Sequence, residues 1–320
     1  MTLPRQNPIP ESSRRRRLVV ALLGSIAVPL LFCSTASAAA TKWFSQKSPF
    51  NNPVAAPGSV DPSSTAWAQA LYGAAGDVGL WVNSDAWTTT VYQANPATPR
   101  VSVWIDNTRK RITIPYSADW RASPDADSHI AIIDGTTGCD YEIPDLNAAP
   151  LSGHSEGTYR IYRGSGAHVP TGHTGAALSL LAGLIRPSDV RAGVIRHALA
   201  FGAPITGPAF VAPASSSDGR TSGGIPEGTR FQLDPSYDLG PLHLSKFQLM
   251  LARALQRYGM YLRDTAGAVT LYAQSTTDGS SYALPVQPLP RDVLLHLRAV
   301  RAPSGVSLDP PTPARCARQH

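Results

Sequence analysis

The amino-acid sequence predicts a mainly-β fold: an antiparallel β-sandwich or jelly-roll-like single domain with two or three docked helices. Short segments in which apolar and polar residues alternate recur along the chain, separated by turn residues, as in antiparallel sheets. Strands and helices do not alternate regularly, so a doubly wound α/β fold is disfavoured. The content of 42% hydrophobic and 16% charged residues supports a packed core.

The first 38 residues match the three parts of a secretory signal peptide. Residues 14–17 are four arginines, residues 18–33 are apolar, and residues 36–38 form a small-residue cleavage site. The apolar segment is shorter than the roughly 20 residues that cross a bilayer. We therefore expect a secreted, extracellular protein that begins near Ala39 and has no integral membrane association after cleavage. Sec and twin-arginine export both fit the leader.

The leader carries most of the net charge of +6, because it holds five arginines and one acidic residue. The tail after residue 300 has a further excess of arginine, so the body between them is close to neutral. The positive charge therefore gives no support for nucleic-acid binding.

The first half of the predicted domain contains one helix and two hairpins. Ser63 or Ser64 can cap a short helix over residues 66–72. The hairpins are predicted from alternating residues on either side of a turn, at 101–105 with 112–116 and at 129–134 with 139–143.

The second half contains the clearest helix, over residues 245–258. Its apolar residues recur at helical spacing, Ser245 and Gln248 can form a capping box, and Gly259 follows as a stop signal. A small apolar helix is predicted at 176–185. Further strands are predicted at 158–163, 194–201, 230–233, 260–264 and 269–274, the last two forming a hairpin. We expect one globular domain over residues 39–301 and a disordered Pro-rich tail over residues 302–320.

Two cysteines remain once the leader is removed, Cys139 and Cys316. An even pair in an exported protein permits one disulfide, which would tie the tail to the body. Two unpaired thiols are the alternative, and the sequence leaves both open. Neither cysteine has metal-site spacing.

Asp140 and Glu142 are the most informative acidic residues. In a strand over residues 139–143 they share one face, with backbones about 6.7 Å apart. Glycosidases use paired carboxyl groups about 5 to 9.5 Å apart, so this pair is eligible as acid and base or nucleophile. The alternative is a polar outer face on an edge strand.

Two further positions have both a functional and a structural interpretation. His197 lies within a predicted apolar strand, where it is either a hydrogen-bonded core histidine or a general acid or base with Tyr258 or Tyr261 as partner. Trp104 points away from its apolar neighbours and could stack on a sugar ring.

Other motifs are weaker. Residues 153–157 match the G-x-S-x-G pattern of serine hydrolases around Ser155, but no buried strand precedes it and no helix follows. Three histidines lie close together in sequence, His154, His168 and His173, and a zinc site there is possible. No acidic residue or cysteine stands at a regular helical spacing from them to complete it. The sequence cannot decide whether calcium occupies the loop of Asp125 and Asp127. We predict no metal centre and no cofactor.

Several segments resemble a group of exported proteins of high-GC Gram-positive bacteria. They are SPFN (48–51), HIAIID (129–134), GCDYE (138–142), AGLIR (182–186), IRHAL (195–199), SDG (217–219), GTRFQLDP (228–235) and RALQRYGMY (253–261). The resemblance covers nearly the whole mature chain and implies one exported domain. It implies no activity and assigns no catalytic residue.

These observations favour an exported carbohydrate-active enzyme that cleaves a polysaccharide or cell-wall glycan as a monomer, with glycoside hydrolysis favoured over elimination. The candidate catalytic residues are Asp140, Glu142, His197, Asp218 and Tyr258. The candidate substrate-binding residues are Trp104, His129, Arg230 and Gln232. The alternatives are a non-catalytic glycan- or cell-wall-binding module and, more weakly, a serine esterase through Ser155. A concave pocket in which the candidate residues converge would favour the enzyme, and a flat aromatic face would favour the binding module.

Overall fold

The computed structural model describes residues 43–55, 59–154, 157–160, 164–167, 173–278, 287–301 and 316, with backbone only at 157–160 and 278. All of them belong to one compact unit that begins at Ala39. The predicted signal peptide and nearly all of the predicted tail lie outside the described residues. No helix in the described ranges is long and apolar enough to cross a membrane.

The mainly-β class is confirmed: strands outnumber helices, and the sheets are mixed, with parallel as well as antiparallel pairs. The largest sheet has six strands. Their order is β1 (Trp81–Asn83), β15 (Thr270–Tyr272), β10 (Leu199–Ala203), β14 (Met260–Thr265), β13 (Arg230–Leu233) and β16 (Leu297–Val300). The pairs β1–β15 and β10–β14 are parallel. Two short strands, β11 (Thr206–Phe210) and β12 (Ile225–Glu227), form a separate parallel pair.

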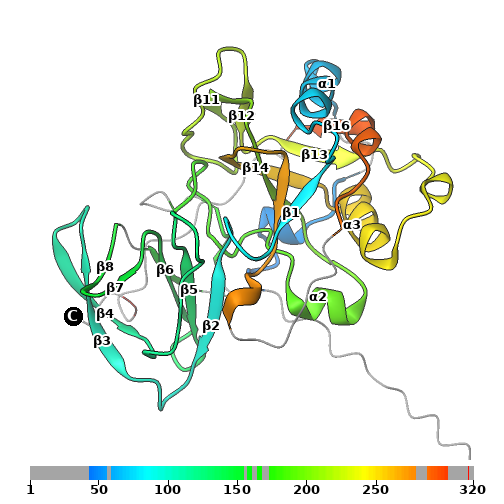
Figure 1. Ribbon diagram of the computed structural model, residues 1–320. Coiled ribbons are helices and arrows are strands. Elements are labelled where there is room, and N and C mark those ends of the chain that lie inside the picture. The colour runs from blue at the N-terminus through cyan, green and yellow to red at the C-terminus, as the bar shows by residue number, and fades with distance from the viewer. Residues whose placement is uncertain are drawn as a thin grey trace, which may run out of the picture. The chain divides into compact units, whose positions relative to one another are not determined.

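Helices α1 (Ser64–Ala74) and α3 (Lys246–Arg257) pack on the six-stranded sheet and close its core, where Leu71, Leu251 and Phe231 are fully buried (Figure 1). The capping box of Ser245 and Gln248 begins α3 as predicted. A third helix, α2 (Pro187–Ala192), ends at Gly193, whose φ of 64° is the left-handed conformation that glycine adopts without strain. Short 3₁₀ segments lie at Pro49–Asn51, Gly240–Leu242, Thr276–Asp278 and Arg291–His296.

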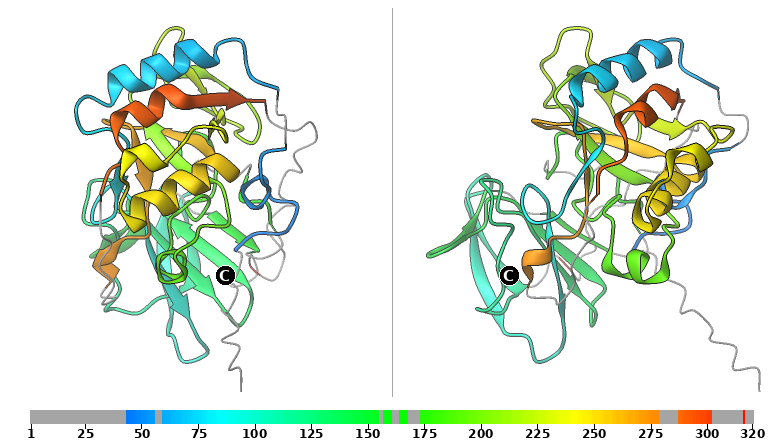
Figure 2. Two further views of the ribbon diagram at one scale, coloured as in Figure 1. Left: turned by 90° about the vertical axis from the view of Figure 1, so that its right-hand side faces the viewer. Right: turned by 45° about the vertical axis from the view of Figure 1, so that its right-hand side comes forward.

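Two four-stranded sheets pack face to face and form the sandwich-like part of the protein (Figures 1 and 2). One has the order β2 (Thr90–Ala94), β5 (Ile130–Asp134), β6 (Cys139–Ile143), β9 (Gly157–Arg160), and the other β4 (Lys110–Pro115), β3 (Arg100–Ile105), β8 (Leu151–Gly153), β7 (Asn147–Ala148). The predicted hairpins at β3–β4 and β5–β6 are confirmed. Cys139 and Cys316 form a disulfide in this core, which decides the alternative that the sequence left open.

The sheet that contains β5 is covered on both faces. Ile130 and Ile132 contact the sandwich core, whereas Ala131 and Ile133 contact a second core that includes Tyr261 of β14 and Tyr272 of β15. Residues that alternate along β5 and β6 are therefore buried on either side. The central strands β5 and β6 of this sheet therefore form an internal layer.

Two local predictions are wrong because tertiary contacts override the local pattern. Residues 176–185 form turns instead of a helix, since Leu180 and Leu181 donate their N–H groups to the carboxylate of Glu142. The strands β14 and β15 do not form a hairpin, because β10 lies between them and pairs with both. The loop between β14 and β15 must therefore pass across the end of β10.

Candidate functional site

A pocket of about 870 Å³ lies where loops of the sandwich part meet loops of the six-stranded sheet. The sandwich part contributes the segments before β5 and after β6, including Asp127, His129 and Asp145. The opposite side is formed by residues 173–175, by residues 216–218, and by the loop between β14 and β15. The crossing of β10 by that last loop therefore helps to build the pocket.

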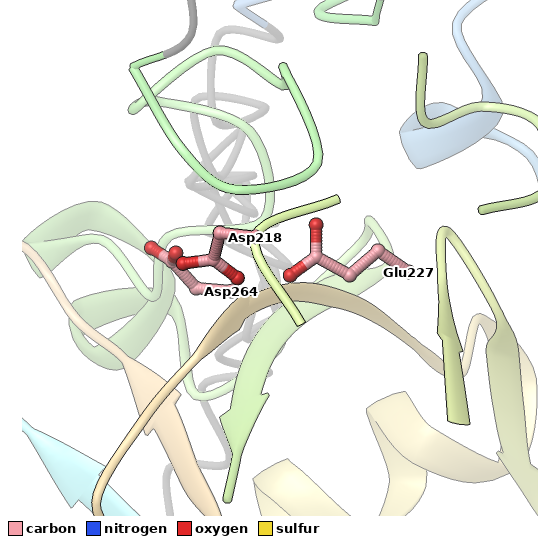
Figure 3. A group of neighbouring side chains, drawn as sticks. All are labelled: Asp218, Glu227 and Asp264. Atoms are coloured by element: carbon pink, nitrogen blue, oxygen red, sulfur yellow. The ribbon is translucent and has the colours of Figure 1, made fainter. Parts of the chain in front are cut away.

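Three carboxyl groups meet in one wall of this region (Figure 3). Asp218 lies in the loop between β11 and β12, Glu227 ends β12, and Asp264 lies near the end of β14. One oxygen of each lies within 4.8 Å of the others. Asp218 and Asp264 line the pocket, whereas Glu227 lies behind them with no exposed surface.

Backbone and hydroxyl donors orient the two aspartates. Thr265 donates to Asp218 Oδ1 from its N–H at 3.2 Å and from its hydroxyl at 2.6 Å, and the Gly175 N–H donates to Asp264 Oδ1 at 3.0 Å. A Cβ on Gly175 would lie 2.5 Å from Asp218 Oδ1 and 2.7 Å from Glu227 Oε1. Only glycine lets the chain approach the carboxyl groups this closely.

The surroundings disfavour three negative charges at this position. Burial, together with Asp218 and the negative charge of Asp264, raises the pKa of Glu227 to about 10. Burial also raises the pKa of Asp264 to about 7, against the opposing charge of Arg263. Arg263 is itself buried: its guanidinium lies 3.9 Å from the ring centroid of Tyr272, and it donates to the carbonyl of Leu180. Within the described part of the chain, these three acids are the group whose ligand atoms are close enough to share one metal ion.

The facing wall carries a histidine and a further acid with shifted pKa values. Burial and the charge of Arg263 lower the pKa of His129 to about 4, so its imidazole is neutral near pH 7. Burial and the negative charges of Asp125 and Asp145 raise the pKa of Asp127. Trp87, 53% exposed, also lines the pocket, and its backbone N–H donates to Asp125.

The structure brings two of the nine candidate residues, His129 and Asp218, into this pocket. His129 immediately precedes β5, and its carbonyl accepts bonds from the Thr90 hydroxyl and the Ser123 N–H. Asp218 is held by Thr265 across 47 residues of sequence.

Asp140 and Glu142 are buried on the inner face of β6 instead of on an edge. Glu142 accepts bonds from the Ser179 hydroxyl and from the N–H groups of Leu180 and Leu181. Burial and the Glu142 charge raise the pKa of Asp140 well above its usual value. Neither residue lines the pocket, and Glu142 joins β6 to the 179–181 turn.

His197 lies just before β10 and not within a strand as predicted, and it is hydrogen-bonded as a core histidine. Its Nε2 lies 3.1 Å from Asp189 Oδ2 and its Nδ1 lies 2.9 Å from the Ala198 carbonyl oxygen. Asp189 also accepts two bonds from the Arg186 guanidinium at the start of α2. Both ring nitrogens therefore have partners, and the contact with Asp189 helps to fix α2.

The other four candidates also lie outside the pocket. Arg230 is buried and donates to the carbonyls of Tyr258 and Asn52, and Gln232 donates to the carbonyl of Gln256. Trp104 is half-buried on β3, opposite Arg111 of β4.

The weaker motifs have mixed outcomes. His154 and His173 line the pocket, whereas His168 and Ser155 lie outside the described residues. Asp125 accepts bonds from the N–H groups of Asp127 and Ser128 and from the Ser123 hydroxyl, so this loop is closed by an Asx turn.

Sequence reasoning identified neither Glu227 nor Asp264 as a candidate site residue. The only signals were an acid ending a short strand and an acid three residues after Tyr261, each common in soluble proteins. Their convergence depends on three segments far apart in sequence. Comparisons with protein-family models, with curated proteins and with solved structures found no match.

Proposed function

We propose that the protein is an exported carbohydrate-active enzyme that cleaves a polysaccharide or cell-wall glycan in this pocket. The observation that carries the proposal is the convergence of His129 and Asp218, each nominated from sequence, on one pocket. A concave site with a few convergent polar groups and shifted pKa values is the usual setting of catalysis. A flat aromatic face would have favoured the binding module.

The pocket has suitable contacts for a sugar. The exposed ring of Trp87 offers a stacking surface for the apolar face of a pyranose, and Asp127, Asp145 and Asn83 offer hydrogen-bond partners for hydroxyl groups. The volume of about 870 Å³ exceeds that of a single sugar ring and fits a short stretch of glycan.

Hydrolysis is the reaction that we favour. Neutral His129 removes a proton from water, whose oxygen bonds to the anomeric carbon as the glycosidic C–O bond breaks. Asp127, in its protonated form, gives its proton to the departing oxygen. His129 accepts a proton and Asp127 supplies one in the same displacement, the two roles that paired carboxyl groups have in inverting glycosidases.

Export is part of the proposal. The leader over residues 1–38 supports it, and so does the Cys139–Cys316 disulfide, because such bonds persist in oxidising compartments.

The test is product analysis of the purified protein with a panel of bacterial and plant polysaccharides. New reducing ends without ultraviolet absorbance from an unsaturated sugar support the proposal. Unsaturated products would show that the enzyme cleaves its substrate by elimination and not by hydrolysis. Retention on an insoluble glycan without any product would contradict the enzyme and favour the binding module.

Variants connect the activity to the pocket. We expect His129→Gln and Asp127→Asn each to lower kcat by about 100-fold or more, the usual contribution of one acid or base. His243→Gln, at a turn outside the pocket, is the matched control and should retain the wild-type rate.

A further inference from the structure

We propose that Asp218, Glu227 and Asp264 form a calcium-binding site in the wall of the pocket. The proposal does not depend on glycan cleavage, since it concerns binding of the ion alone. Its starting point is that three carboxylate oxygens from three chain segments lie within 4.8 Å of one another (Figure 3).

Glu227 supplies an independent observation. It has no exposed surface, and neither of its side-chain oxygens accepts a hydrogen bond among the described residues. Figure 3 shows its carboxyl group directed toward Asp218 and Asp264. A buried polar atom without a partner is unfavourable, and a bound cation would supply a partner for the Glu227 carboxylate.

Hydrogen bonds hold the two aspartates in place. The donors from Thr265 and Gly175 reach Oδ1 of Asp218 and Oδ1 of Asp264. Hydrogen bonds to metal-binding carboxylates fix their orientation. The close approach of Gly175 keeps the cluster compact on that side.

The spacing favours calcium over magnesium. Calcium takes oxygen ligands at about 2.3 to 2.6 Å, so two oxygens on one ion can be up to about 5 Å apart. Magnesium binds at about 2.1 Å, which limits that separation to about 4.2 Å. The separation of up to 4.8 Å therefore fits calcium without movement.

The site is open on the pocket side. Asp218 is exposed and Asp264 is partly exposed, so water or a ligand oxygen can complete the six to eight contacts that calcium takes. Arg263, whose charge acts on Asp264, is engaged with Tyr272 and the Leu180 carbonyl. A divalent ion would offset the charge of the three carboxylates.

Calorimetric titration of chelator-treated, purified protein with calcium chloride tests the proposal. We expect saturable binding of one ion, a higher melting temperature with calcium than with chelator, and weaker binding of magnesium. Absence of calcium binding, or tighter binding of magnesium, would overturn it.

Variants test which residues bind the ion. Glu227→Gln keeps the side-chain shape and should weaken calcium binding at least tenfold, on the order of the loss when metal-site partners are changed. Asp218→Asn, on an exposed loop, should do the same and is informative even if Glu227→Gln does not fold. Asp145→Asn removes a pocket acid outside the cluster and should bind calcium as the wild type does. Wild-type affinity in both cluster variants would contradict the assignment.

Discussion

At the scale of single residues, chemical environment separates side chains that look alike in sequence. His129 and His197 both adjoin apolar strands, yet His129 faces a pocket and His197 is bonded to Asp189 and to a backbone carbonyl. Sequence suggested a substrate-binding role for His129 and left a structural and a catalytic role open for His197, because the partners lie on other segments. Asp218, a predicted catalytic residue, lines the pocket, whereas Glu227 gave no signal until the fold brought it behind Asp218.

The pKa of His129 predicts the acid limit of catalysis. Because burial lowers that pKa to about 4, His129 stays neutral and able to accept a proton until the pH falls through about 4. We expect the acid limb of the kcat/KM profile near this pH, with circular dichroism showing that the protein is still folded there. An acid limb near 6.5, the ordinary histidine value, would exclude His129 as the base.

Asp189 predicts a contribution to acid stability. Although burial opposes ionisation, the bonds and charges of His197 and Arg186 lower its pKa to about 2. Ionised Asp189 therefore contributes stability that is present above about pH 4, the unfolded-state value, and is lost as the pH falls through about 2.

Urea unfolding between pH 2 and 7 measures this contribution. Asp189→Asn should lower the free energy of unfolding by about 3 kcal/mol at pH 7, because the buried Arg186 charge loses its partner. Below pH 4, the free energy of unfolding of this variant should decrease less with falling pH than that of the wild type. Asp238→Asn, which changes an exposed turn, should retain the wild-type pH dependence, and an equal loss in both variants would argue against the assigned contacts.

At the scale of elements, the sequence correctly predicted those helices and hairpins whose signals lie within one segment. The β3–β4 and β5–β6 hairpins and helix α3 have alternation or capping within one segment, and all three are present. The β14–β15 hairpin fails because β10 inserts between the two strands, a long-range event without a local sign. The same insertion creates the pocket wall, so the site was less predictable than the elements around it.

Gly183 tests how closely two of these elements must pack. Its φ is 75°, and a Cβ there would overlap the backbone of Leu199 and Ala200 at the start of β10. Gly76 also has a positive φ, 56°, but a Cβ there would have no neighbour within 4 Å.

Thermal and urea unfolding of the two alanine variants separate strain from packing. Gly76→Ala should lower the free energy of unfolding by about 1 to 2 kcal/mol, the cost of a left-handed backbone for alanine. Gly183→Ala should lower it by about 1 to 3 kcal/mol more, because the added Cβ also overpacks against β10. Equal losses would mean that the Gly183 turn does not pack on β10 as described.

At the scale of the whole chain, the disulfide joins residues 177 positions apart and fixes Cys316 to the sandwich core. Sequence could name the two cysteines but could not tell a bridge from two free thiols. Because the bridge closes a long loop, Cys316→Ser should lower the free energy of unfolding by about 2 to 5 kcal/mol.

The control for this prediction is chemical. Reducing agent should destabilise the wild type to a similar extent and leave Cys316→Ser unchanged. A wild-type protein that shows two free thiols under non-reducing conditions would contradict the bridge.

The claim that a glycan occupies the pocket is tested most directly by a crystal structure of His129→Gln with an oligosaccharide from the polymer that the protein cleaves. We predict a sugar ring in the pocket, stacked on Trp87, with the scissile oxygen within reach of residue 129 and Asp127. An oligosaccharide bound elsewhere, with the pocket unchanged, would contradict the account.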